Sequence, residues 1–207
     1  MRLQVVSDKI IRVQATAEQG FRDKQSLIIV PQNGKANYKV EEQGEKLIIT
    51  TAAMRAVLNE ATGQITFYDL KDHVLLNEVA QGGKTFKPFT VPDREIGVDI
   101  AKVPESQKHG WSWRALFDSP DNEAFYGLGQ HQSEELNMKG KNEDLFQYNT
   151  KVSVPFVISN KNYGILWDSY SYCRWGNPED YLQLNRAFKL YDTDGKEGQL
   201  TGTYVDK

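Results

Sequence analysis

The chain has 207 residues, of which 39% are hydrophobic and 26% are charged, and its formal net charge is −3. This balance is typical of an ordinary globular protein that buries its own core, and without a basic surface field a nucleic-acid partner is disfavoured. The single cysteine, Cys173, excludes an internal disulfide, and the apolar runs are far too short to span a bilayer.

Alternation of apolar and polar residues with a period of two dominates the first half and predicts strands. In "KIIRVQAT", for example, Ile11, Val13 and Ala15 fall on one face of the expected strand. "EATG" ends one of the strand pairs, because Gly63 can take the positive φ that tight turns require. The strands predicted in this half are residues 9–16, 46–51, 54–59, 64–70 and 73–79.

The second half continues the strand pattern, with one interruption. Residues 82–94 predict a loop or an edge strand, because Pro88 and Pro92 cannot donate to a hydrogen-bond ladder. A single helical turn is expected at 133–137, where Ser133 provides a cap. The remaining predicted strands are residues 96–103, 110–119, 144–149, 152–160, 163–169 and 182–192. Many short strands separated by turn signals indicate one all-β domain, a sandwich or a barrel.

"FYGLGQHQSEELNMKG", residues 125–140, contains a Gly-x-Gly step that follows an aromatic strand pattern. A dinucleotide-binding fingerprint needs a third glycine, where Gln132 stands here, and it needs a surrounding βαβ unit. Neither requirement is met. Gly127 and Gly129 are therefore expected to let the strand bend or approach another backbone closely, with the strand turning at the end of its sheet.

Histidines and carboxylates form no specific catalytic or metal-binding pattern. His73, His109 and His131 are scattered. His131 with Glu134 or Glu135 makes only part of a zinc set, so a solvated loop is favoured. The carboxylate pairs are candidates for glycosidase chemistry only by abundance, and solvated charge is the simpler interpretation. These pairs are 134/135, 143/144 and 179/180. No metal or cofactor is predicted.

Aromatic residues are concentrated in the second half, and the first half contains no tryptophan. Aromatic faces stack on sugar rings, but aromatic side chains at alternate strand positions also fill cores, and the core is the favoured role for most of them. Tyr148 in "QYNTK" and Trp175 in "RWGNPED" are exceptions, because each is expected in a loop beside polar groups.

Residues 123–170 resemble the signature stretch of the N-terminal domain of glycoside hydrolase family 31, which contains α-glucosidases and α-xylosidases. The pattern is an E-x-F-Y-G-L-G strand, a polar loop, an aromatic-x-x-N segment, a V-P-F strand and a Y-G-I-L-W-D-S strand. The matching residues are Glu123, Phe125, Tyr126, Gly127, Gly129, Phe146, Asn149, Pro155, Phe156, Tyr163, Gly164 and Asp168.

This resemblance implies a large antiparallel two-sheet β-sandwich of the galactose-mutarotase-like type, packed on a (β/α)8 catalytic barrel of the same parent chain. In the family the catalytic aspartates lie in the barrel, and no motif of their kind occurs here. The resemblance therefore implies no catalytic residue and no hydrolysis by this chain alone. It implies instead that the domain supports the barrel and contributes a loop to the rim of the oligosaccharide pocket. The expected rim residues are Asn149 and Thr150, with Tyr148 as a wall and Gln147 beside it. A simple turn held by Asn side-chain bonding is the alternative.

The predicted domain covers residues 1–190, and the Gly-rich tail 191–207 resembles the start of a lectin-type insert known in some α-xylosidases. This favours an α-xylosidase over an α-glucosidase as the parent. Two alternatives stay open: a stand-alone carbohydrate-binding module, and a mutarotase-type enzyme in which His109 or His131 works with a carboxylate. No signal-peptide pattern follows Met1, so the compartment is undetermined, and a periplasmic or secreted parent with its leader removed fits the sequence.

Overall fold

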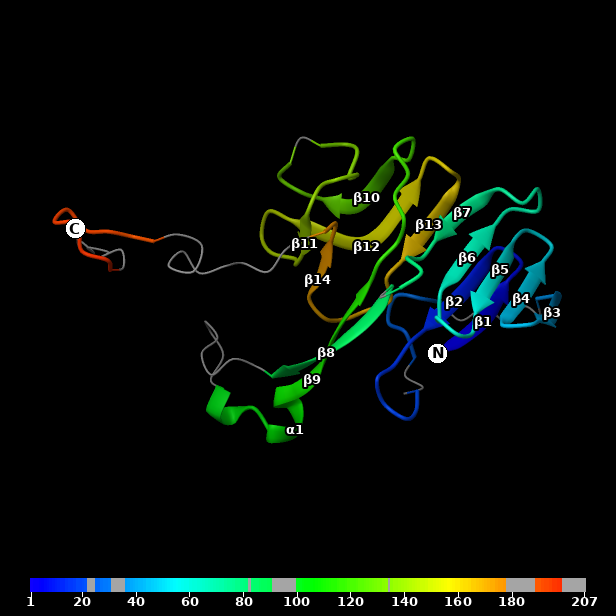
Figure 1. Cartoon of the computed structure of the whole chain (residues 1–207), viewed down its shortest axis with the longest axis horizontal. Coiled ribbons are helices and arrows are strands. Elements are labelled where there is room, and N and C mark those ends of the chain that lie inside the picture. The colour runs from blue at the N-terminus through cyan, green and yellow to red at the C-terminus, as the bar shows by residue number, and fades with distance from the viewer. Residues whose placement is uncertain are drawn as a thin grey trace.

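The computed structural model describes residues 1–21, 25–30, 36–81, 83–90, 100–133, 135–177 and 189–198. In these ranges the chain forms strands joined by turns and loops, with two short helical segments, η1 (Ile100–Lys102) and α1 (Glu105–Lys108) (Figure 1). Every strand pairing in this part is antiparallel. The strands are β1 (Arg2–Ser7), β2 (Ile10–Gln14), β3 (Tyr38–Gln43), β4 (Lys46–Thr51), β5 (Arg55–Asn59), β6 (Ile65–Tyr68), β7 (Val74–Asn77), β8 (Lys84–Thr90), β9 (His109–Ala115), β10 (Phe125–Gln130), β11 (Glu143–Leu145), β12 (Val152–Ser159), β13 (Tyr163–Leu166) and β14 (Cys173–Trp175). The predicted all-β antiparallel class is confirmed.

The N-terminal half is a five-stranded sheet in the order β3-β4-β5-β6-β7, against which the β1–β2 hairpin packs (Figure 1). Alternation places one set of side chains of β4, β5 and β6, which is apolar, on the face that meets the hairpin. The opposite face is mixed, because it carries Ile48 and Val57 as well as ion pairs such as that between Arg55 and Asp72. The buried core residues are Ile49, Ala56, Leu58 and Ile65, with Leu3, Val5, Ile11 and Val13 packed against them.

The C-terminal half contains the three-stranded sheet β10-β12-β13 and the β11–β14 pair. Its core holds Phe125, Leu128, Met138 and Val157, which are buried. Trp175 packs edge-on against Phe125 with ring centroids 5.3 Å apart, and its Nε1–H donates to the Met138 carbonyl oxygen at 3.1 Å. Trp175 therefore belongs to strand β14 and the core, and the prediction of a loop aromatic was wrong, because a partner for its indole N–H lies inside.

Gly127 and Gly129 lie inside strand β10, which continues past both to Gln130. Their φ angles are 127° and 100°, and the register with β12 shifts between them. A Cβ at Gly127 would lie 2.6 Å from the Phe156 carbonyl oxygen. The predicted close approach of two backbones is thus confirmed. The strand does not turn at the end of the sheet but continues through a register irregularity, where residues 154–156 of β12 lie opposite Leu128.

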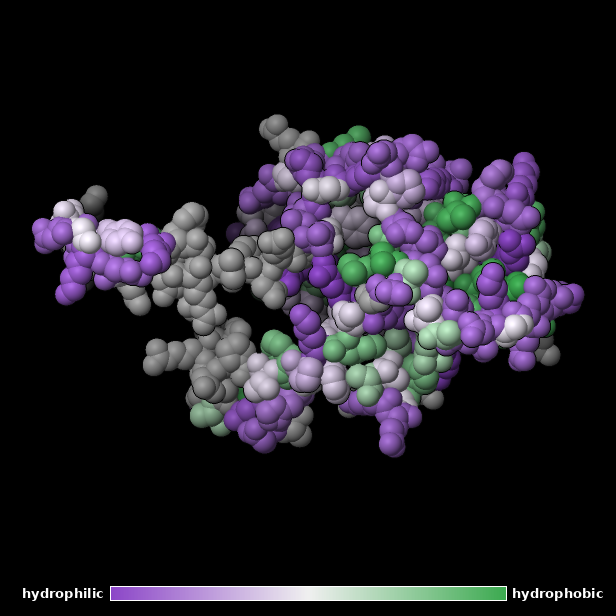
Figure 2. All heavy atoms as spheres, viewed as in Figure 1, coloured by the Kyte–Doolittle hydropathy of each residue, from purple (hydrophilic) through white to green (hydrophobic). Residues whose placement is uncertain are grey.

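Strand β12 exposes apolar side chains on one face while its other face is buried. Its burial alternates along the whole strand, and the exposed set is Val152, Val154, Phe156 and Ile158. In the view of Figure 2, by comparison, hydrophilic residues cover most of the surface and hydrophobic residues form small separate groups. A sheet that is apolar on both faces is typical of an inner layer, which a further element covers.

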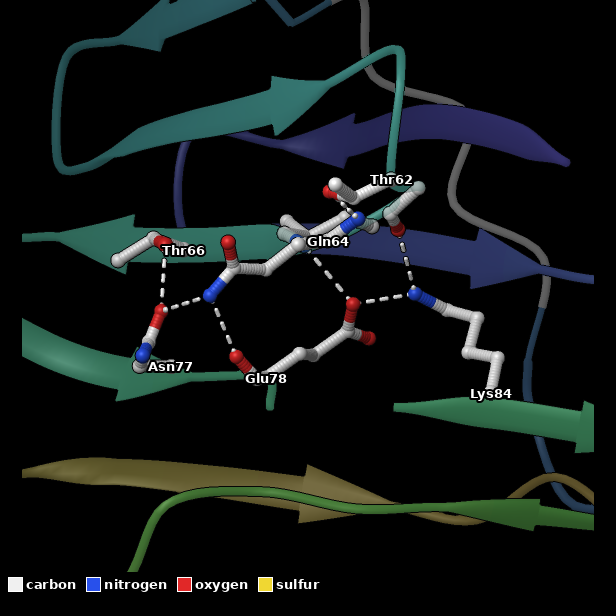
Figure 3. A network of polar contacts seen from close by, with 8 residues as sticks. Thr62, Gln64, Thr66, Asn77, Glu78 and Lys84 are labelled. Carbon is white, nitrogen blue, oxygen red and sulfur yellow. Dashed lines mark hydrogen bonds and ion pairs between the residues drawn. The ribbon is translucent and has the colours of Figure 1, made fainter. Parts of the chain in front are cut away.

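A buried polar network joins the five-stranded sheet to strand β8 (Figure 3). One carboxylate oxygen of Glu78, Oε2, accepts the Ile65 main-chain N–H at 2.8 Å and pairs with Lys84. Lys84 also donates to the Gly63 carbonyl oxygen at 3.1 Å, and Gln64 Nε2 donates to the Glu78 carbonyl oxygen at 2.7 Å. The polar groups of this junction are therefore satisfied within the protein, as burial requires.

A second polar link joins the N-terminal hairpin to the end of the β13 segment. Asp168, from the "YGILWDS" motif, accepts from Arg12 at 3.1 Å and from the Ser26 hydroxyl at 2.9 Å. Asp168 thus holds strand β2 and the segment at residue 26 together, although they lie more than 140 positions away in sequence. The matched motif residue has a structural role here.

Three predictions of local structure differ from the structure or lie outside it. Residues 135–137 form no helix and contain a bend at Leu136, and Glu134 lies outside the described residues. Of the strand predicted at 96–103, residues 96–99 lie outside the described residues, and residues 100–102 form the short helix η1 rather than a strand. Most of the strand predicted at 182–192, the 179/180 carboxylate pair and the last nine residues of the tail lie outside the described part of the chain.

Candidate functional site

The predicted rim residues form one exposed hairpin turn. Tyr148 and Lys151 pair through the main chain, with the Lys151 N–H donating at 2.9 Å and the Tyr148 N–H donating at 3.4 Å. Asn149 and Thr150 lie at the tip between them, and all four predicted residues, Gln147 included, are exposed. Within the described part of the chain, the Asn149 side chain makes no hydrogen bond, so bonding by this side chain does not hold the turn. The four residues thus lie together on one exposed turn.

An aromatic pair lies beside this turn. The rings of Phe146 and Tyr148 are tilted by 33° with their centroids 6.1 Å apart, and both side chains are exposed. Exposed aromatic faces next to amide and hydroxyl groups match the chemistry of a sugar ring, which has apolar faces and polar edges. The turn therefore offers both kinds of contact.

A buried charged cluster lies at the base of the turn. Glu143 Oε2 is 3.1 Å from Lys151 Nζ and 3.2 Å from His131 Nδ1, and these three side chains are 13%, 10% and 5% exposed. His131 Nε2 donates to the Leu128 carbonyl oxygen at 2.7 Å. The expectation of a solvated loop around His131 was therefore wrong. Nothing in the spacing of these residues indicates the cluster, because it forms only when three separate segments pack together.

His131 is not placed to serve a mutarotase-type enzyme. One ring nitrogen lies against Glu143 and the other donates to a main-chain carbonyl oxygen, so neither is presented to a substrate. His109 is exposed and pairs with Glu105, which lies four residues earlier on the short helix α1. His73 pairs in the same way with Asp69. Among the residues the structure describes, no group of three His, Cys, Asp or Glu side chains could hold a metal ion.

The two exposed carboxylates that pair with histidines titrate below their ordinary range. The hydrogen bond from His73 lowers the pKa of Asp69. Hydrogen bonds from Lys108 and His109 lower the pKa of Glu105. Both pairs are open to solvent, where salt and water screen such interactions, so they mark surface structure rather than an active site.

Another buried carboxylate, Glu123, holds the ends of β12 and β13. Its Oε1 accepts from the Ser159 hydroxyl at 2.5 Å and from the Tyr163 hydroxyl at 2.6 Å, and Lys161 Nζ lies 3.5 Å from its Oε2. Burial, together with the hydrogen bond to Glu123 and its negative charge, raises the pKa of Tyr163. Glu123 and Tyr163 both belong to the motif that carries the family resemblance, and here they fix the strand ends.

Tyr163→Phe is expected to lower stability at neutral pH by about 2 kcal/mol, because a hydrogen bond to a buried carboxylate is lost. The wild-type protein should lose stability as pH rises above 10.0, the ordinary tyrosine pKa, since Tyr163 keeps its proton in the folded state and loses it on unfolding. The variant should lose less over this range. Urea denaturation between pH 7 and pH 11 measures both effects, and equal slopes in the two proteins would contradict this assignment.

The fold and these clusters define an all-β domain of antiparallel sheets. In the residues that the structure describes, no helix is long and apolar enough to cross a membrane. A sequence profile of the glycosyl hydrolase 31 N-terminal galactose mutarotase-like domain matches residues 1–175. The chain belongs to this family of domains, found at the N-terminus of family 31 glycosidases that include α-xylosidases. The boundary expected at 190/191 stays a prediction.

Solved structures and curated proteins agree with this assignment. The α-xylosidase of Xanthomonas citri is 38% identical with a TM-score of 0.79, over 95% of this chain and 20% of that one. A soil-metagenome α-xylosidase, solved with xylose, is 26% identical with a TM-score of 0.68, over 83% and 26%. The α-xylosidase of Saccharolobus solfataricus is 25% identical over 83% of this chain and 22% of its own length. An uncharacterized family 31 glucosidase of Pseudescherichia vulneris is 27% identical over 82% and 32%. The chain spans about a third or less of these relatives.

Proposed function

We propose that this chain is the non-catalytic N-terminal module of a retaining α-glycosidase, more specifically an α-xylosidase, and that it contributes the 147–150 turn to the rim of the sugar pocket. The observation that carries the proposal is the 38% identity and TM-score of 0.79 with an α-xylosidase whose chain extends far beyond the matched part. The α-xylosidases among the relatives favour this substrate class over α-glucosides.

The partner of the module is a (β/α)8 catalytic barrel of the same parent chain. The exposed apolar face of β12 supports this partner, because four apolar side chains at alternate positions of one strand need cover from another element. The outer face of the five-stranded sheet has charged pairs, Lys39–Glu41 and Arg55–Asp72, among its apolar residues. The exposed face of β12 is therefore the better candidate for contact with the barrel.

The test is the activity of the full-length parent enzyme on p-nitrophenyl α-xyloside and p-nitrophenyl α-glucoside. A higher kcat/KM on the xyloside supports the proposal, and a higher kcat/KM on the glucoside contradicts its α-xylosidase part. The 207-residue chain alone should hydrolyse neither substrate, since the catalytic aspartates of the family lie in the barrel. Turnover by purified chain would contradict the non-catalytic role.

In the parent enzyme, Asn149→Ala and Thr150→Ala are each expected to raise KM for a xyloglucan oligosaccharide about three- to tenfold, as loss of one polar contact would. The kcat should stay nearly unchanged, because the reacting groups lie elsewhere. Steady-state kinetics measure both values. Ser112→Ala, which removes an exposed hydroxyl from β9, is the control and should change neither value.

A stand-alone carbohydrate-binding module is the alternative that one observation favours, namely the exposed Phe146–Tyr148 pair. Calorimetric titration of the chain with xyloglucan oligosaccharides separates the two functions. Saturable micromolar binding by the chain alone favours the module, whereas a pocket rim completed by a barrel predicts no measurable binding.

A further inference from the structure

We propose that Glu143 is a positioning residue that fixes the Asn149–Thr150 turn through Lys151 and His131. The inference rests on the proposed function, because it assigns to this turn the sugar-contacting role. It concerns a buried cluster that lies beneath the turn and exposes almost nothing to a ligand.

Lys151 is the residue through which the carboxylate acts on the turn. It directly follows Thr150, and its main chain closes the turn by pairing with Tyr148 in both directions. The Lys151 side chain is only 10% exposed, and its Nζ lies 3.1 Å from Glu143 Oε2. The backbone that ends the turn is thus linked, through the Lys151 side chain, to the buried Glu143 carboxylate.

His131 also lies against the Glu143 carboxylate that Lys151 contacts. Its Nε2 must carry a proton, because the Leu128 carbonyl oxygen at 2.7 Å can only accept. Its Nδ1 lies 3.2 Å from the same Glu143 oxygen that Lys151 contacts, and this contact is an ion pair only with a protonated ring, since Nδ1 makes no hydrogen bond. Leu128 is buried between Gly127 and Gly129, where the register with β12 shifts, and has a φ of 67°. The cluster therefore connects the turn to a part of β10 whose backbone is tightly constrained.

Glu143 itself is held by secondary structure. It lies in β11 and pairs with Trp175 of β14, whose indole packs in the core. The carboxylate thus joins three segments: the loop after β10, the strand β11 and the 148–151 turn. Its second oxygen, Oε1, accepts from the Ser133 hydroxyl at 3.4 Å.

The energetics favour a positional role over a simple stabilising one. Removing a carboxylate and an ammonium group from water is costly, and apolar replacements of a buried ion pair are often as stable as the pair. Apolar packing, however, lacks the directionality of a charged hydrogen bond. Loss of Glu143 should therefore loosen the turn, and binding of sugar would then have to order it, which raises KM rather than lowering kcat.

The test uses the full-length parent enzyme with Glu143→Gln, Lys151→Met and the double variant. Lys161→Met is the matched control, because it removes another cation from a buried carboxylate, Glu123, near the opposite end of β12. Two quantities are measured: KM and kcat on a xyloglucan oligosaccharide, and hydrogen exchange of a peptide covering residues 146–152. Melting temperatures report general destabilisation in every variant.

We expect each single variant at the cluster to raise KM about tenfold with kcat within about twofold, and to speed exchange at the turn. The double variant should resemble the single ones, because all three remove the same contact. Lys161→Met should lower the melting temperature but change neither KM nor hydrogen exchange at the turn. Lys151→Arg, which keeps the charge, should restore most of the wild-type KM.

Three outcomes separate the hypotheses. Unchanged exchange at residues 146–152 in Glu143→Gln overturns the positioning role. Faster exchange with an unchanged KM supports the positioning of the turn by Glu143 but overturns its sugar-contacting role, and with it the proposed function of the turn. An equal rise in KM for Lys161→Met assigns the effect to general destabilisation and overturns the inference.

Discussion

Gly129→Ala is expected to lower the free energy of unfolding by about 4 kcal/mol, the combined cost of backbone strain and overpacking. The φ of 100° at this position is rarely adopted by residues with a side chain. A Cβ here would lie 2.9 Å from Val154 N and closer still to the Val152 carbonyl oxygen. Both atoms belong to the backbone of the neighbouring strand, so relief requires β12 to move away from β10.

Urea denaturation followed by tryptophan fluorescence measures this loss. Gly44→Ala is the matched control, because Gly44 has a φ of 61° but no atom within 4 Å of a Cβ built there. The control should lose only about 1 kcal/mol, the cost of a left-handed backbone for an L-residue. Equal losses at the two positions would contradict the role given to the close approach of the strands.

Lys84→Met is expected to lower the free energy of unfolding by about 3–5 kcal/mol, because it leaves the Glu78 carboxylate buried without its cation. The side chains of Glu78 and Lys84 are 5% and 13% exposed, so water compensates little of the lost contact. In Figure 3 the ammonium group of Lys84 meets this carboxylate and the turn carbonyl before β6. The same denaturation assay measures the effect.

The double variant Glu78→Gln/Lys84→Met should recover most of this loss. The amide oxygen of a glutamine can still accept the Ile65 N–H, which Glu78 now accepts at 2.8 Å, and no charge stays buried. A double-mutant cycle then gives a coupling energy of about 2–3 kcal/mol. Additive single effects would show that the pair contributes no coupling, in contradiction to the network described here.

Much of the fold follows from the sequence, because strand alternation is a local signal. The strand at 46–51 and the inward face of Ile11 and Val13 are found where the pattern predicts them. The Gly-x-Gly step of β10 predicts a close approach of two backbones, since no other residue tolerates it as well. The Gln147–Thr150 segment was selected by its match to a family motif, and no local pattern would have singled it out.

The sequence alone thus determined the strand class, the glycine step and the family to which the domain belongs. Only the tertiary structure decided which polar groups meet: His131 with Glu143 and Lys151, Asp168 with Arg12, and Trp175 with the core. The physical reason is the range of the interactions. Alternation and backbone strain act between neighbouring residues, whereas a buried charge is placed by partners that are distant in sequence and are brought near by packing of separate strands.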